Sequence, residues 1–189
     1  MRRLPQFVLF AASASLAWLW MQAIHEFGHV LGGWFTGANL RRVILHPMSI
    51  SRTDFDLNPN PLIVCWSGPV LGSLIPIMVW MIACFRSWSG EPWLRFFAGF
   101  CLVANGAYLA IGSFDGIGDA GDLLHHGAPI GTLWLFGAIA IPAGLRLWHR
   151  LGPAFGLGAE ALPVRWSMAL RVTTLLILTV VAESILSER

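Results

Sequence analysis

The sequence contains no lysine and few charged residues of any kind. All 12 basic residues are arginine, and charged residues make up only 12% of the 189 residues. Soluble domains carry about a quarter charged residues, so half that share indicates a chain that is not surrounded by water. The formal net charge of +2 is too small and too scattered for a nucleic-acid-binding surface.

Cysteine is also scarce. Cys65, Cys84 and Cys101 lie far apart in the sequence, and no C-x-x-C pair or finger spacing is present. Each lies in or at the edge of an apolar run, so we expect all three to pack as small apolar side chains. They carry no information about the redox compartment.

Apolar residues, in contrast, make up 56% of the chain and gather in five long runs. A bilayer core of roughly 30 Å needs about 20 mostly apolar residues per helix. The runs cover about Phe7–Trp34, Leu62–Phe85, Trp93–Ile111, Pro129–Leu147 and Trp166–Ile185. We therefore predict an all-α fold, a polytopic membrane helix bundle of about five transmembrane helices in one membrane-embedded domain over residues 1–189.

The connection at about Thr36–Pro61 differs from the shorter ones. It contains "RRVILHPMSISRTDFDLNPNP". In places apolar and polar residues alternate in this stretch, which is rich in β-branched residues and ends in an Asn/Pro cluster. These features predict a short β-hairpin or an irregular loop at the membrane surface.

Polar residues interrupt the first apolar run at "QAIHEFGHVLGG", residues 22–33. His25 and His29 are four residues apart, so on a helix both imidazoles project from one face, one turn apart. Two imidazoles so placed can bind one Zn²⁺, and Glu26 beside them can act on a zinc-bound water as general base. An ionised side chain inside a membrane helix is costly without partners, and a metal supplies them. We predict a zinc site with His25 and His29 as ligands and Glu26 as catalytic residue.

A tetrahedral zinc site with one bound water needs a third protein ligand. No further histidine follows His29 at the extended H-E-x-x-H-x-x-G-x-x-H spacing, so another segment must supply it. The richest polar cluster is "GSFDGIGDAGDLLHHGAP", residues 112–129. It contains Asp115, Asp119, Asp122, His125 and His126. The i, i+4, i+7 spacing of the aspartates would place them on one helical face, and we expect both histidines at the water interface. A solvated loop with Asp as turn and capping residue is the alternative.

With these motifs the chain resembles the site-2 protease family of intramembrane zinc metalloproteases. That family combines H-E-x-x-H on one spanning helix with an Asp ligand from a later helix, often within an "LDG"-like motif. "FDG" at 114–116 is similar to that motif, but "GDAGDLLHHGAP" at 118–129 is more similar to the "SDA"-like motif of a smaller branch. The resemblance therefore implies Asp119 as the third metal ligand, with Asp115 and Asp122 as rivals. It covers a catalytic core of about residues 7–129 and leaves about 129–189 as extra helices.

A further similarity is "SGPVLGSL", residues 67–74, which resembles the family's "GPxxN"-like element. Gly72 stands where the family has Asn, so a substrate or oxyanion role is not carried over to this position. Asn105 in the third run is a candidate for that polar contact, or else a buried amide bonded to a neighbouring helix.

The combined prediction is an intramembrane zinc metalloendopeptidase with one Zn²⁺ per chain. It would be an integral, multi-pass protein in contact with membrane lipid, in a bacterial-type cell membrane, and would hydrolyse single-span or other membrane-associated proteins. The glycine-rich segments 31–37 and 112–121 would line a polar cavity, and the 36–61 connection would receive substrate as an added β-strand. Two other functions stay open: a non-proteolytic zinc-binding membrane protein, either a sensor or an inactive relative, and a proton or ion conduit through the Asp/His cluster.

Overall fold

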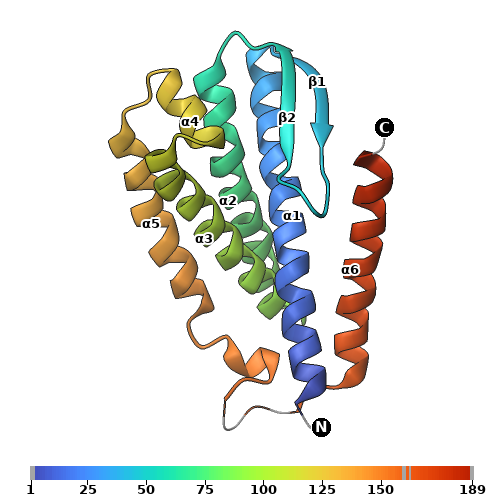
Figure 1. Cartoon of the computed structure of the whole chain (residues 1–189). Coiled ribbons are helices and arrows are strands. Elements are labelled where there is room, and N and C mark those ends of the chain that lie inside the picture. Colours follow the sequence, from blue (N-terminus) through green and yellow to red (C-terminus); the bar gives the residue numbers. More distant parts are fainter. Residues whose placement is uncertain (1–2, 159–160, 162, 188–189) are drawn as a thin grey trace.

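The computed structural model describes residues 3–158, 161 and 163–187 (Figure 1). The two ends of the predicted 1–189 domain lie outside the described residues. The same holds for the last two positions of the predicted 129–189 region and for residues 159, 160 and 162 within it.

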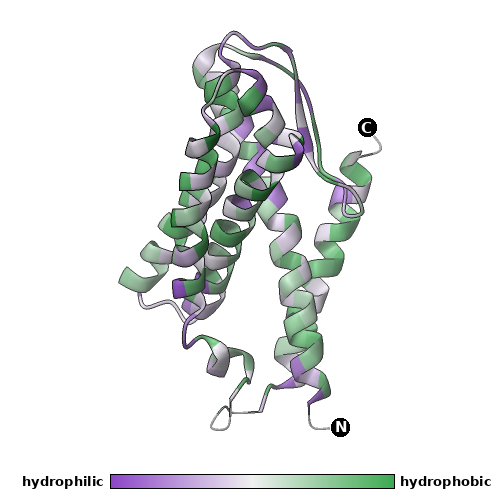
Figure 2. Cartoon of the chain, turned by 60° about the vertical axis from the view of Figure 1, so that its left-hand side comes forward, coloured by the Kyte–Doolittle hydropathy of each residue, from purple (hydrophilic) through white to green (hydrophobic). Residues whose placement is uncertain are grey.

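Five helices are long and apolar enough to cross a membrane, which confirms the five predicted spans. They are α1 (Leu4–Thr36), α2 (Pro61–Phe85), α3 (Glu91–Asp115), α5 (Ile130–Trp148) and α6 (Trp166–Ser187). Apolar residues cover these helices along most of their length (Figure 2), and many large apolar side chains point outward. An outward apolar surface on long helices is what a lipid environment requires, so the protein is a multi-pass membrane protein.

Two short helical segments complete the chain. α4 (Gly118–His125) follows α3 after a sharp turn, and a 3-10 helix, η1 (Gly152–Phe155), follows α5. α1 is the longest element, because its 33 residues span about 50 Å at 1.5 Å per residue. That exceeds the roughly 30 Å hydrocarbon core, so α1 tilts or extends beyond it.

The connection after α1 forms the predicted hairpin. β1 (Asn39–Ile44) pairs antiparallel with β2 (Arg52–Leu57) in a two-stranded sheet. The hairpin folds back along α1 (Figure 1). The backbone N–H of Ser51 donates to Oε1 of Gln22 at 2.9 Å, about four helical turns before the end of α1. Polar side chains in the middle of an apolar helix need such partners, and the hairpin supplies them.

The helices pack closely where small residues meet, as is usual between membrane helices. α3 lies against α5, where a Cβ at Gly137 would lie only 2.5 Å from the Cβ of Ala110. α1 packs on α2, and α6 packs mainly on α1. The three free cysteines follow the expected packing role in part, because Cys101 is buried, Cys65 is half-buried and Cys84 is exposed.

Candidate metal centre

α1 presents His25 and His29 on one face, as their spacing predicts. The two ring centroids lie 4.8 Å apart, and Nε2 of His25 is 3.1 Å from Nε2 of His29. Both side chains are buried. The inner nitrogens of the two imidazoles therefore face one another across a small space at the α1–α2 contact.

α4 brings Asp119 to the same point. Oδ2 of Asp119 lies 2.7 Å from Nε2 of His25 and 3.2 Å from Nε2 of His29. Ala120 and Leu123 of α4 are fully buried in a cluster with Leu109 of α3 and Leu133 of α5. This apolar anchor holds α4 in place and directs Asp119 at the histidines.

Two glycines make the turn that returns the chain from α3 to α4. Gly116 and Gly118 have φ values of 62° and 55°, in the left-handed region that side chains with a Cβ rarely adopt. At Gly118 there is also no space, because a Cβ would overlap the Tyr108 hydroxyl. That hydroxyl accepts a hydrogen bond from the backbone N–H of Asp119 at 3.2 Å, which fixes the start of α4.

The outer nitrogen of each imidazole is held by a hydrogen-bond acceptor. Nδ1 of His29 lies 2.8 Å from the Val64 carbonyl oxygen, so it must carry the proton. Nδ1 of His25 lies 2.7 Å from Oδ1 of Asn105. The Asn105 amide nitrogen donates to the Cys101 carbonyl, which leaves Oδ1 for His25, so this Nδ1 also carries a proton. A neutral imidazole has only one N–H, and both Nε2 atoms therefore direct lone pairs into the space between the rings.

Three electron-pair donors thus converge with no hydrogen of their own between them. One ligand atom from each of His25, His29 and Asp119 lies within 4.8 Å of the others, and theirs is the group of this kind found among the described residues. In a tetrahedral zinc site, metal–ligand bonds of about 2.0–2.1 Å place neighbouring ligand atoms about 3.3 Å apart. The observed separations of 2.7–3.2 Å are close to that, so a small expansion would admit a metal ion.

α2 leaves room for this arrangement. A Cβ at Gly68 would overlap Nε2 of His29 and lie 2.9 Å from Nε2 of His25. One turn later, a Cβ at Gly72 would lie 3.2 Å from the amide nitrogen of Asn105. Asn105, which is 1% exposed, fills the space beside Gly72.

The charge at the centre favours a cation. Asp119 contributes a carboxylate beside two neutral imidazoles, and the facing Nε2 atoms of these imidazoles carry no proton. A metal ion between them would meet only lone pairs and one negative charge.

Glu26 lies beside the ligand pair and is only 3% exposed. Its Oε1 accepts a hydrogen bond from the Ser51 hydroxyl at 2.7 Å, and its Oε2 accepts one from the Thr53 hydroxyl at 2.6 Å. The hairpin therefore holds both oxygens of this carboxylate. A carboxylate has about four lone-pair sites, so acceptor capacity remains on each oxygen.

No family model, curated protein or solved structure matches the chain.

The other candidate ligands lie apart from the centre. Asp115 is the last residue of α3 and Asp122 lies on α4, and both are exposed. The prediction that the three aspartates share one helical face is wrong, because the turn at Gly116 separates Asp115 from the other two. His125 and His126 are exposed, as expected, and lie outside the ligand group.

Several partners of the centre were not predicted from the sequence: Gln22, Ser51, Thr53, Val64 and Tyr108. Gln22 could have been predicted, since it lies one turn before Glu26 on the same helix and is polar within an apolar run. The hydroxyls of the hairpin and the α2 carbonyl had none. The glycines of 31–37 also differ from expectation, since Cβ atoms at Gly32 and Gly33 would overlap Ser67 and Phe55, and so they serve close packing.

Proposed function

We propose that the protein is an intramembrane zinc metalloendopeptidase of the site-2 protease type, acting in a bacterial-type cell membrane. One observation carries this proposal: His25, His29 and Asp119 direct three donor atoms at one point, and Asn105 and Val64 hold the ring protons outward. Two imidazoles and a carboxylate are a common ligand set of catalytic zinc sites, which keep the fourth position for water or substrate. Imidazole and carboxylate alone suit other metals as well, and the adjacent Glu26 is what favours zinc hydrolysis.

The residues of the chain divide the chemistry between them. A zinc ion held by His25, His29 and Asp119 would supply Lewis-acid activation of water and of a peptide carbonyl. Glu26 accepts the proton of the attacking water and passes it to the leaving amine. Ser51 and Thr53 orient the Glu26 carboxylate for this transfer. Asn105 keeps His25 in the tautomer that presents Nε2.

The hairpin favours the proposal that the substrate is a peptide. Among the described residues its two strands pair only with one another, so each has one edge that no other strand covers, and the hairpin contacts Glu26 directly. An extended peptide added to such an edge satisfies its own backbone groups, which a substrate unwound within a membrane must do. We infer that single-span or other membrane-associated proteins are cleaved after such local unwinding.

A second function is favoured by a specific observation. Both Glu26 oxygens already accept hydroxyl hydrogen bonds, an arrangement that also suits a structural carboxylate. The alternative is therefore a non-proteolytic zinc-binding membrane protein, a sensor or an inactive relative.

Metal analysis and cleavage assays on the purified full chain separate the two functions. We expect one zinc per chain, lost in His25→Ala and Asp119→Asn and retained in the matched controls Asp115→Asn and Asp122→Asn. Glu26→Gln should keep the zinc and lose cleavage of an unfolded or single-span substrate. Zinc binding without any turnover by the native chain would favour the non-proteolytic alternative, and full cleavage by Glu26→Gln would refute the proposed mechanism.

A further inference from the structure

An apolar cavity of about 430 Å³ lies between α1, α3 and α6. Small-molecule sites usually have volumes of about 300–1,000 Å³. None of the residues that line it belongs to the metal centre. α6 packs mainly on α1, so α3 and the turn before it form the opposite wall.

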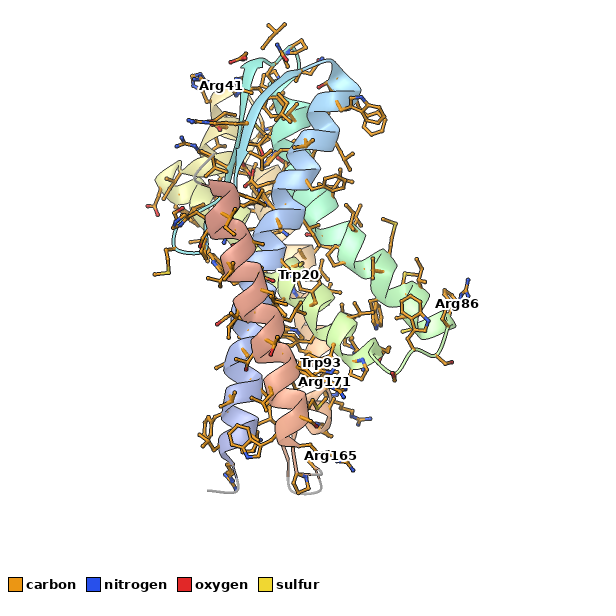
Figure 3. All side chains as sticks on the ribbon, turned by 90° about the vertical axis from the view of Figure 1, so that its right-hand side faces the viewer. Trp20, Arg41, Arg86, Trp93, Arg165 and Arg171 are labelled. Carbon is orange, nitrogen blue, oxygen red and sulfur yellow. The ribbon has the colours of Figure 1, made fainter. Side chains whose placement is uncertain are left out.

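Arg171 is the one charged residue among those that line the cavity. The lining residues of α6 are Met168, Arg171, Val172 and Leu175, an i, i+3, i+4, i+7 pattern that marks a single helix face. Arg171 thus shares a face with the apolar side chains that line the cavity. Figure 3 views the molecule from this side.

The positive charge of Arg171 lacks a counter-ion among the described residues. Arg171 makes no hydrogen bond or ion pair within the part of the chain that the structure describes. The carboxylate of Glu91, at the start of α3, accepts a hydrogen bond from the Trp80 indole of α2 at 2.6 Å and makes no ion pair with Arg171. Charged side chains in membrane segments are retained with a partner or with access to water. The cavity therefore suits a partner that brings negative charge.

The remaining walls suit a hydrocarbon chain and a headgroup. Trp20 of α1 and Trp93 of α3 line the cavity, with Ser89 and Gly90 of the α2–α3 turn. Trp93, in the first turn of α3, has a position typical of the level at which acyl chains meet headgroups. Trp20 lies deeper, in the middle of α1, where its indole donates to the Thr179 hydroxyl of α6 at 3.1 Å.

We propose that this cavity binds one acidic glycerophospholipid of the surrounding bilayer, with its phosphate on Arg171 and one acyl chain between Trp20 and Trp93. The Arg171 guanidinium can donate hydrogen bonds to two phosphate oxygens at once. The apolar walls of the cavity remove the acyl chain from water. Arg171 lies about 7 Å along the helix axis from Trp166, where α6 begins, so its side chain reaches the headgroup level. Basic pockets between transmembrane helices bind acidic headgroups in this way. The site is independent of the proposed proteolysis.

The test is a lipid titration of the purified full chain in detergent, followed by native mass spectrometry. The two probes are phosphatidylglycerol and phosphatidylcholine with identical acyl chains. We expect one phosphatidylglycerol per chain, bound about fivefold more tightly than phosphatidylcholine, as one favourable arginine contact implies. Arg171→Gln should abolish the preference. The matched control Arg165→Gln removes the same charge from an exposed residue that does not line the cavity and should keep it.

A second measurement tests where the acyl chain of the bound lipid lies. Phosphatidylglycerol with brominated acyl chains should quench tryptophan fluorescence, and Trp20→Phe and Trp93→Phe should each reduce the quenched fraction, whereas Trp34→Phe should not. Helix content measured by circular dichroism reports that each variant is folded. Equal affinity of the native chain for both lipids overturns the proposal, as does a preference that survives Arg171→Gln. A preference lost equally in Arg165→Gln would assign it to the membrane surface and also overturn it.

Discussion

The two imidazoles can serve as metal ligands only because their other nitrogens are fixed. Hydrogen bonds from Nδ1 to Oδ1 of Asn105 and to the Val64 carbonyl set the tautomer and the ring orientation of His25 and His29, as partners of ligating histidines usually do. The backbone carbonyl cannot be removed by substitution, but the Asn105 side chain can. Asn105 is thus the residue at which this arrangement can be tested.

We predict that Asn105→Ala weakens zinc binding by about 10–100-fold, the usual effect of losing such a partner. His25 is then free to rotate and to exchange tautomers, while all three ligands remain. The measurement is competition for zinc with a chelator of known affinity. Ser113→Ala removes another buried polar side chain of α3, one that bonds Trp134, and should leave the affinity unchanged. Equal zinc affinities of native chain and Asn105→Ala would contradict the assignment.

The Glu26 carboxylate is held by the hairpin and not by its own helix. In the double variant Ser51→Ala, Thr53→Val this buried anion loses both hydroxyl donors. Hydrogen bonds to charged groups contribute about 1.5–3 kcal/mol each, so we predict that the free energy of unfolding falls by about that much per bond. Cleavage should fall as well, because the carboxylate is no longer oriented. Reversible unfolding in detergent and the cleavage assay measure the two effects.

A double-mutant cycle separates this contact from general damage to the hairpin. In a Glu26→Gln background the same two hydroxyls face a neutral amide. Removing them should therefore lower the free energy of unfolding by less than it does in the native background. Thr53→Ser keeps the hydroxyl and should stay near the native values. An equal loss of stability in both backgrounds would show that the hydroxyls act elsewhere.

At the scale of elements, length and hydropathy were sufficient to predict the helices. All five spans agree with the apolar runs to within a few residues, because each run must bury its backbone polar groups within a single helix. The hairpin followed from its own alternation and turn residues. Its position along α1 did not, since it depends on the contact between Ser51 and Gln22, which are far apart in the sequence.

The aspartate segment shows where sequence periodicity fails. Asp115, Asp119 and Asp122 fit a continuous helix, but Gly116 and Gly118 adopt positive φ and divide the segment between α3 and α4. Glycine permits such a turn without requiring it. The histidine pair could be predicted from local spacing, whereas the choice of Asp119 required the family resemblance and the tertiary packing of α4.

Gly118 offers a test of this turn. We predict that Gly118→Ala weakens zinc binding, because left-handed backbone costs a residue with a Cβ about 1–2 kcal/mol and the new methyl group would overlap the Tyr108 hydroxyl. Chelator competition gives the affinity. Gly127→Ala is the matched control, since Gly127 also has positive φ but open space around it, and it should change stability but not zinc affinity. Zinc affinity reduced equally in both variants would refute a specific role for the turn.

At the scale of the molecule, the metal centre is built from the first part of the chain, and the last two long helices contribute no residue to it. Its residues come from α1, α2, α3, α4 and the hairpin, and none comes from α5 or α6. They all lie within residues 22–119, inside the predicted catalytic core of about 7–129. A metal ion at the centre would therefore link α4 to α1 directly, whereas α6 is attached mainly by its contact with α1.

We therefore predict that zinc removal loosens the molecule unevenly. A metal that binds only the folded state stabilises it by about 2.7 kcal/mol at a hundred times its dissociation constant, so chelation should speed amide exchange in α4 by up to about 100-fold. Exchange in α6 should stay the same, because no ligand lies on it. Hydrogen–deuterium exchange of the native chain with and without chelator measures this, and Asp119→Asn should show no chelator effect. If α4 and α6 respond alike, the ion does not join α1 to α4, and the stability of the bundle must depend on apolar packing alone.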